Sequence, residues 1–109
     1  MEIIQIDANR GERYYDSRLE VDFRTKSVAL DLSPIRLTRM EFQLLALLAQ
    51  NAGEIVPRAT LLMNVWGYGS EIRTRTLDVH VRRLRRKLRD YSRQHIETVF
   101  GIGYRFQAE

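Results

Sequence analysis

Residues 74–91 read TRTLDVHVRRLRRKLRDY, and the spacing of their apolar side chains predicts one long helix. Leucine and valine recur every three or four residues, so at about 100° per residue they fall on one side. Thr74 is a suitable N-cap. The apolar stripe contains Leu77, Val81, Leu84 and Leu88, and the opposite face holds Arg75, Val79, Arg82 and Arg86, with Arg83 on its flank. One face is therefore expected to lie in a core, while the other presents arginines to an anionic partner.

The positive charge of the chain is concentrated in this region. The formal net charge is +4 at pH 7, but residues 73–93 contain nine basic residues and only two acidic ones. Arginine accounts for 16 of the 18 basic residues, and its N–H donors match phosphate and the O6 and N7 atoms of guanine. Val79 suits a thymine methyl group, and Asp78 is spaced to orient either Arg75 or Arg82. This combination favours a helix that reads bases in the major groove of DNA.

The composition is that of an ordinary globular domain. The 109 residues suit one domain, with 44% hydrophobic and 29% charged residues. Cysteine is absent, which excludes disulfides and thiolate metal sites and suits a reducing compartment. The longest apolar run, residues 44–49, is too short to cross a bilayer, and the N-terminus lacks a targeting pattern. We expect a cytoplasmic protein without metal, cofactor or membrane association.

Short strands are predicted before the first helix. Residues 19–23 alternate apolar and polar side chains, as a half-buried strand does, and candidates at 27–31 and 34–37 follow after turn-forming residues. Residues 13–16 are a weaker strand candidate. Residues 1–12 are either a linker or an N-terminal extension of the sheet.

Two helices are predicted between these strands and the arginine-rich helix. Thr38 and Glu41 have the spacing of a capping box, in which both side chains satisfy free amides at a helix start. Apolar residues then recur at helical spacing until Asn-Ala-Gly at 51–53 ends the helix. The second helix is predicted to begin near Pro57, because proline suits a first helical turn, and to end after Trp66.

A β-hairpin is predicted at the C-terminus. Residues 96–100 and 104–106 read as strands, and the Gly-Ile-Gly sequence between them permits a tight turn. The order is therefore strands, three helices and a hairpin, which indicates the α+β class.

Four motifs in this order resemble the C-terminal effector domain of OmpR/PhoB-type response regulators. They are LTRMEFQLL at 37–45, LLMNVWG at 61–67, RTLDVHVRRLRRKL at 75–88 and TVFGIGYRF at 98–106. The resemblance implies a winged helix-turn-helix domain over residues 13–109, with a four-stranded N-terminal antiparallel sheet, a three-helix core and a C-terminal hairpin wing. It further implies that the third helix, about 74–91, reads the major groove, while the wing, 96–106, approaches the adjacent minor groove.

The resemblance also assigns roles to individual residues and implies partners. It places Arg75, Asp78, His80, Arg82, Arg83 and Arg86 at or near DNA, and Trp66, Thr98 and Tyr104 at positions that support or touch the phosphate backbone. It places the 67–73 loop, with Tyr68, Glu71 and Ile72, where family members meet RNA polymerase. Tandem direct-repeat DNA sites, a phosphorylated receiver domain and a sensor histidine kinase are implied as partners. Because no receiver domain fits in this chain, we expect an excised domain or a stand-alone regulator.

Several of these residues also have ordinary structural interpretations. Trp66 and His80 are suited to packing, and Thr98 to an ordinary strand position. Tyr104 is expected to lie partly in the core with its hydroxyl free to reach DNA, and His95 to lie on a surface loop. The 67–73 loop could equally be a simple connector.

Two positions depart from the family pattern. Pro57 stands where the family often has a serine N-cap. Phe100 stands where many members have a wing arginine, so the resemblance does not supply an arginine contact in the minor groove. Phe100 could pack under the hairpin, touch sugars in the minor groove or contact a neighbouring subunit.

Three other function classes compete with sequence-specific DNA binding. An enzyme acting on nucleic acid needs paired carboxylates or a nucleophile with its base, but the two acids of the basic helix, Asp78 and Asp90, lie on different parts of it. A protein-interaction module would dock its basic helix on an acidic partner. RNA binding is disfavoured because no aromatic stacking platform is apparent.

Overall fold

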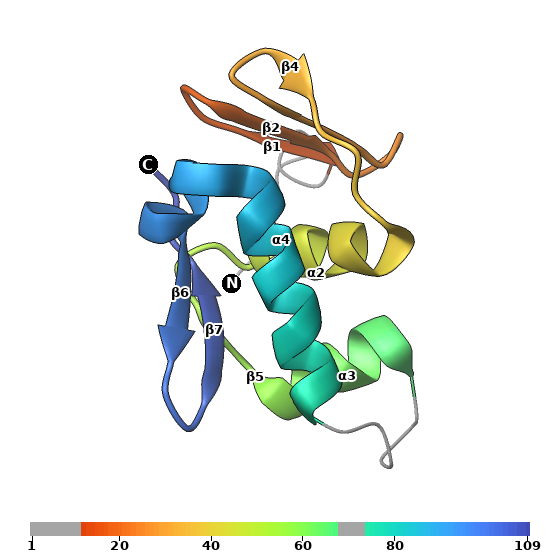
Figure 1. Ribbon diagram of the computed structural model, residues 1–109, viewed down its shortest axis with the longest axis vertical. Helices are drawn as coiled ribbons and strands as arrows, with labels where there is room; N and C mark the ends of the chain where they lie inside the picture. The colour runs from red at the N-terminus through yellow and green to blue at the C-terminus, as the bar shows by residue number, and fades with distance from the viewer. Residues whose placement is uncertain (1–11, 68–73) are drawn as a thin grey trace.

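The computed structural model describes residues 12–67 and 74–109, which form two β-sheets joined by helices (Figure 1). The N-terminal sheet is antiparallel and contains four strands in sequence order, as the resemblance implied. Its strands are β1 (Arg13–Tyr15), β2 (Leu19–Asp22), β3 (Ser27–Leu30) and β4 (Ser33–Pro34). In β2 the predicted alternation is confirmed, because Leu19 and Val21 are buried and Glu20 is exposed.

The first helix of the core, α2 (Arg39–Gln50), begins at the predicted capping box. The backbone N–H of Glu41 donates to the Thr38 hydroxyl at 3.2 Å, and the N–H of Thr38 donates to the Glu41 carboxylate at 2.9 Å. The helix ends at Asn51, its C-cap, as predicted. The next helix, α3 (Arg58–Trp66), starts one residue after Pro57, which lies in extended conformation before the helix rather than within its first turn.

The second sheet contains a strand that the sequence pattern did not reveal. Strand β5 (Ile55–Pro57) pairs with the second strand of the hairpin, which consists of β6 (Ile96–Val99) and β7 (Gly103–Phe106). The strand order is β5-β7-β6. Gly103 permits this pairing, because a Cβ atom there would lie 2.0 Å from the Val56 carbonyl oxygen. The hairpin is thereby tied to the chain segment that leads into α3.

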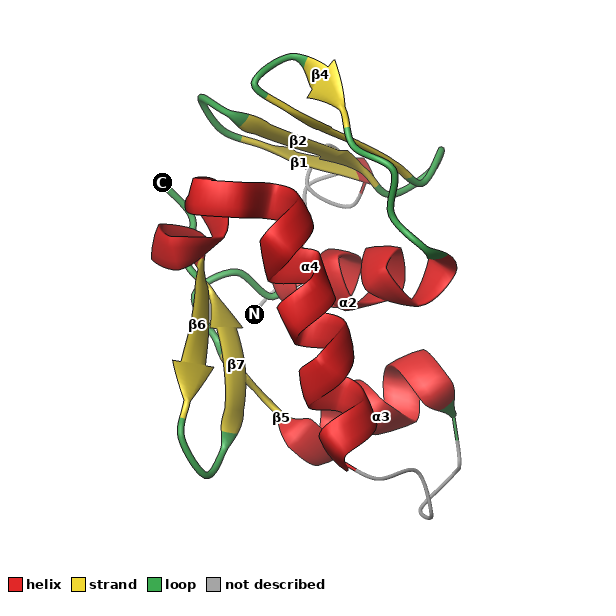
Figure 2. Ribbon diagram, viewed as in Figure 1, coloured by secondary structure: helices red, strands yellow, loops and turns green. Residues whose placement is uncertain are grey.

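The arginine-rich helix α4 (Thr74–His95) is longer than predicted and is kinked (Figure 2). Arg89 interrupts it with φ 53° and ψ −137°, a region that non-glycine residues occupy at a cost of about 1–3 kcal/mol. The Ser92 hydroxyl donates to the carbonyl oxygens of Arg89 and Arg85 at 2.8 and 3.1 Å. These two bonds tie the segment after the kink to carbonyl groups at and before it.

The segment after the kink corrects the expectation for His95. This residue is buried at the end of α4, not exposed on a loop. Its ring stacks on Tyr91 with centroids 3.9 Å apart, and its Nδ1–H donates to the Gln107 carbonyl oxygen at 2.5 Å. The kink causes the difference, because it returns the chain over Phe106 instead of releasing it into solvent.

The apolar stripe of α4 forms the centre of the core. All four predicted residues of the stripe are buried, and they pack with leucines of α2, with α3 and with the inner faces of the sheets. The buried members of α4 are Leu77, Val81, Leu84, Leu88 and Tyr91. No helix in the described ranges is long and apolar enough to cross a membrane.

A partly buried ion pair joins α2 to α4. The Glu41 side chain is only 2% exposed, and its carboxylate accepts a hydrogen bond from the Lys87 ammonium at 2.6 Å. Burial raises the pKa of the Glu41 carboxyl, but the Lys87 ammonium and the Thr38 amide outweigh this effect, so the pKa lies below its ordinary value. The same carboxylate therefore caps one helix and orients another.

We expect Glu41→Gln to reduce the free energy of unfolding by about 1–3 kcal/mol at pH 7, because the charge-assisted bonds to Lys87 and Thr38 are weakened. A carboxyl whose pKa is lowered by folding stabilises the fold above its ordinary pKa and loses this effect as the pH falls through the folded value. The difference between the two proteins should therefore shrink between pH 7 and pH 3. Urea unfolding measures it, with the exposed Glu54→Gln as control. An equal loss in both variants would contradict the role of Glu41.

Candidate nucleic-acid interface

The outward face of α4 carries the arginines that the sequence pattern placed there. Arg75, Arg82, Arg83 and Arg86 are exposed, and Val79 is half-buried among them. Among the described residues, none of these four arginine side chains makes a hydrogen bond or an ion pair with the rest of the chain. Their N–H donors are therefore available to an external anion or to base edges.

Asp78 does not orient these arginines, contrary to the expectation from its spacing. Its two carboxylate oxygens instead lie 2.7 Å from the Nη2 atom of Arg58, at the start of α3. The Tyr104 hydroxyl, on β7, donates to the same carboxylate at 2.7 Å. Asp78 prefers these partners because they come from two neighbouring elements and are themselves buried or half-buried. One carboxylate thus joins α3, α4 and the hairpin.

We call the contacts of Asp78 with Arg58 and Tyr104 the Asp78 junction. These contacts shift the pKa values of Asp78 and Tyr104 in opposite directions. Burial raises the pKa of the Asp78 carboxyl, but the hydrogen bonds from Arg58 and Tyr104 lower it by more than burial raises it. The pKa therefore lies below its ordinary value. Burial and the neighbouring carboxylate raise the pKa of Tyr104. Tyr104 lies in the core and is only 4% exposed, and its hydroxyl is engaged by Asp78 instead of being free. Contact of Tyr104 with DNA stays a prediction. The backbone N–H of Arg58 also donates to the Ile102 carbonyl oxygen in the hairpin turn at 3.0 Å.

Trp66 and His80 lie together where α3 meets α4. Their rings meet edge to face, with centroids 5.0 Å apart and an angle of 80° between planes. The Nδ1–H of His80 donates to the Thr76 carbonyl oxygen at 2.8 Å, which holds the ring against its own helix. Both side chains are half-buried, so part of each side chain has a packing role. Contact of either residue with phosphate stays a prediction.

Arg85 is a second connection between α4 and the hairpin, and it is not among the site residues predicted from the sequence. Its Nη2 atom donates to the Thr98 hydroxyl at 2.7 Å and to the Ile96 carbonyl oxygen at 2.9 Å. Its guanidinium also lies 5.5 Å from the centre of the Tyr104 ring. Arg85 is one helical turn from Val81 and next to Leu84. Its position beside the apolar stripe could have indicated that it packs against another element. Arg58 had no such signal, because its partner Asp78 is 20 residues away.

The tip of the hairpin is apolar and exposed. Phe100 is 90% exposed, so it does not pack under the hairpin. Contact of Phe100 with the minor groove or with a neighbouring subunit stays a prediction. Ile102, on the same turn, is also exposed. Tyr68, Glu71 and Ile72, the predicted polymerase contacts, lie outside the described residues. Within the described ranges, no group of three histidine, aspartate or glutamate side chains could hold a metal ion.

Comparisons with known proteins agree on one family. The family model described as "Transcriptional regulatory protein, C terminal" matches residues 33–106. HprR, a transcriptional regulatory protein of Escherichia coli strain K12, is 46% identical over 93 residues, which cover 84% of this chain and 42% of HprR. The chain therefore spans about two fifths of the length of this relative.

Solved structures share the fold. The response regulator DrrB of Thermotoga maritima, described as an OmpR/PhoB homolog, has a TM-score of 0.81 and 31% identity, with 89% of this chain and 45% of DrrB covered. The RstA DNA-binding domain of Klebsiella pneumoniae, solved in complex with the RstA box, has a TM-score of 0.79 and 33% identity, with 88% of this chain and 97% of that domain covered. The winged-helix arrangement expected from the motifs is thus confirmed.

We expect Tyr104→Phe to lower the free energy of unfolding by about 1–2 kcal/mol, because the Asp78 carboxylate loses a buried hydroxyl donor. Tyr15→Phe is the matched control, since the Tyr15 side chain is 62% exposed and its hydroxyl makes no hydrogen bond among the described residues. Thermal and urea unfolding measure both variants. Equal stability of Tyr104→Phe and wild type would mean that the hydroxyl contributes nothing to the junction.

Proposed function

The chain belongs to the family of transcriptional regulatory proteins defined by this C-terminal domain, and we propose that it binds double-stranded DNA sequence-specifically as the output domain of a two-component response regulator. The observation that carries the proposal is the outward face of α4. Its four exposed arginines make no hydrogen bond or ion pair among the described residues, while the opposite face is fixed in the core. The function is binding rather than catalysis, and it controls transcription.

The geometry supports a helix that reads the major groove. Arg75, Arg82 and Arg86 lie on one face at helical spacing, and each guanidinium is suited to a guanine edge or to a phosphate. Arg83 lies on the flank of this face, and half-buried Val79 adds an apolar contact for a thymine methyl. Because the Asp78 junction and Arg85 hold α4 to α3 and to the hairpin, these side chains approach DNA from a fixed frame.

Family membership also supports proposals about partners. We propose that the domain occupies tandem direct repeats about one helical turn apart, so that two α4 helices meet the same face of the duplex. In the complete protein a receiver domain and a sensor histidine kinase would control it in the cytoplasm. The 67–73 segment would contact RNA polymerase through Tyr68, Glu71 and Ile72.

We expect Arg82→Ala and Arg86→Ala each to weaken binding to the preferred DNA sequence by about 1–3 kcal/mol and to relax the preference at one base pair. The preferred sequence is first selected from a random duplex pool. Arg24→Ala is the matched control, because Arg24 is exposed in the turn between β2 and β3, outside α4. Binding isotherms at fixed salt concentration measure the change. Wild-type affinity in both α4 variants would show that this face does not read DNA.

We expect Phe100→Arg to tighten DNA binding and to steepen its salt dependence by up to about one counterion, because arginine is attracted to the negative potential of a narrow minor groove. Leu32→Arg adds the same charge at a residue that is 99% exposed in the turn between β3 and β4, away from the hairpin. Affinity is measured against salt concentration on one duplex. If both variants keep the wild-type slope, the wing does not approach the minor groove.

A further inference from the structure

The concave side of the α4 kink forms a second basic surface. A groove with a volume of about 600 Å³ lies between the two parts of the helix and the start of β6, and we call it the kink groove. Its charged lining residues are Arg82, Arg85, Arg86, Arg89, Asp90 and Arg93. Figure 2 shows α4 turning at its upper end before the chain descends into β6. Five arginines in one concave surface produce a strong local positive potential.

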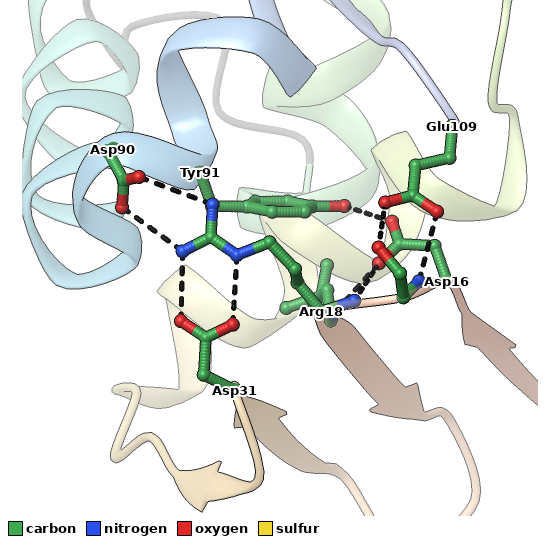
Figure 3. Close-up of polar contacts among 8 residues, drawn as sticks. Asp16, Arg18, Asp31, Asp90, Tyr91 and Glu109 are labelled. Atoms are coloured by element: carbon green, nitrogen blue, oxygen red, sulfur yellow. Dashed lines mark hydrogen bonds and ion pairs between the residues drawn. The ribbon is translucent and has the colours of Figure 1, made fainter.

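The single acid lining this groove, Asp90, is paired with an arginine outside the groove. Asp90 accepts hydrogen bonds from the Nη2 and Nη1 atoms of Arg18, at 3.2 and 3.3 Å (Figure 3). Arg18 also makes a bidentate contact with Asp31, with both distances 2.9 Å. Asp90 is therefore held toward the N-terminal sheet, and the five arginines of the groove outnumber it.

Four of the five groove arginines keep their donors free. Arg85 is engaged with Thr98, but the side chains of the others make no hydrogen bond or ion pair within residues 12–67 and 74–109. The four are Arg82, Arg86, Arg89 and Arg93. Arg89 and Arg82 interact electrostatically with Asp31 and Asp78, but their N–H donors stay free. Guanidinium groups with free donors along one open groove are suited to an anion with several oxygen atoms, such as a phosphate diester.

The backbone at Arg89 gives an independent indication of a ligand. Its φ of 53° lies in a region that glycine adopts readily and that is strained for a residue with a side chain. An arginine at this position therefore costs conformational free energy. Strained residues of this kind are found preferentially at ligand sites. Here the side chain at the strained position is one that lines the groove and adds to its positive charge.

We propose that the kink groove binds the sugar–phosphate backbone of the DNA duplex, beyond the base pairs that the outward face of α4 reads. The proposal rests on the proposed function. Arg82 and Arg86 belong to both surfaces, so the groove continues the reading face. The groove runs from these two arginines along α4 to the start of β6, so a backbone strand that passes the reading face at Arg82 and Arg86 can continue into it.

The test compares Arg89→Gln/Arg93→Gln with Arg24→Gln/Lys26→Gln. Both pairs remove two positive charges, but the control residues are exposed in the turn between β2 and β3, at the opposite end of β2 from Arg18. Binding is measured against salt concentration on the selected site, once trimmed to the base pairs that are read and once with about one turn of flanking duplex. On the longer duplex we expect the kink-groove variant to lose up to about two counterions of salt dependence, with its ranking of base sequences unchanged. On the trimmed duplex the loss should be smaller.

Each other result overturns the proposal in a recognisable way. A salt slope equal to that of the control variant would show that the groove does not contact phosphates. Unchanged DNA binding with lost binding of a poly-aspartate peptide would assign the groove to an acidic protein segment. If the wild type prefers no duplex sequence, the proposed function itself fails. Circular dichroism checks that the double variant folds. If it does not, Arg93→Gln is tested alone, because it leaves the strained Arg89 unchanged. This single variant should reduce the salt dependence of binding by about one counterion.

Discussion

The burial of the α4 stripe holds an arginine-rich helix in place. Five guanidinium or ammonium groups between Arg82 and Lys87 repel one another, and an isolated helix of this sequence has little to offset that repulsion. Burial of each leucine or valine of the stripe stabilises the fold by about 1.5–3 kcal/mol, which exceeds the few tenths of a kcal/mol expected for each exposed like-charge pair. The core therefore decides that the charges line up on one face.

Partners from other elements then determine which charges of α4 stay available. Lys87 is bound to Glu41 of α2, and Arg85 is bound to Thr98 of the hairpin. The two acids of the helix are likewise engaged, Asp78 by Arg58 and Asp90 by Arg18. These contacts remove negative charge from the exposed face and leave arginines there. The contacts that hold α4 in place therefore also increase the share of unpaired positive charge on its exposed face.

The two sheets place the hairpin and the kink relative to α4. Pairing of β5 with β7 ties the hairpin to the start of α3, and the Asp78 junction ties both to α4. At the other end, Arg18 of the N-terminal sheet holds Asp90 just after the kink, with its guanidinium 5.8 Å from the centre of the Tyr91 ring (Figure 3). The reading face, the kink groove and the wing are thus parts of one rigid frame.

The sequence alone determined the elements whose signals are local. Helical periodicity predicted the stripe and the arginine face of α4, and a three-residue spacing predicted the capping box of Thr38 and Glu41. Only the tertiary structure decided the contacts between residues far apart in the chain, because neither charge nor spacing identifies a partner 20 or more residues away. For this reason Asp78 was assigned to its own helix instead of to Arg58 and Tyr104, and β5 was missed. The kink at Arg89 was also invisible, since no glycine or proline marks it and the bonds from Ser92 that stabilise it form only in the folded chain.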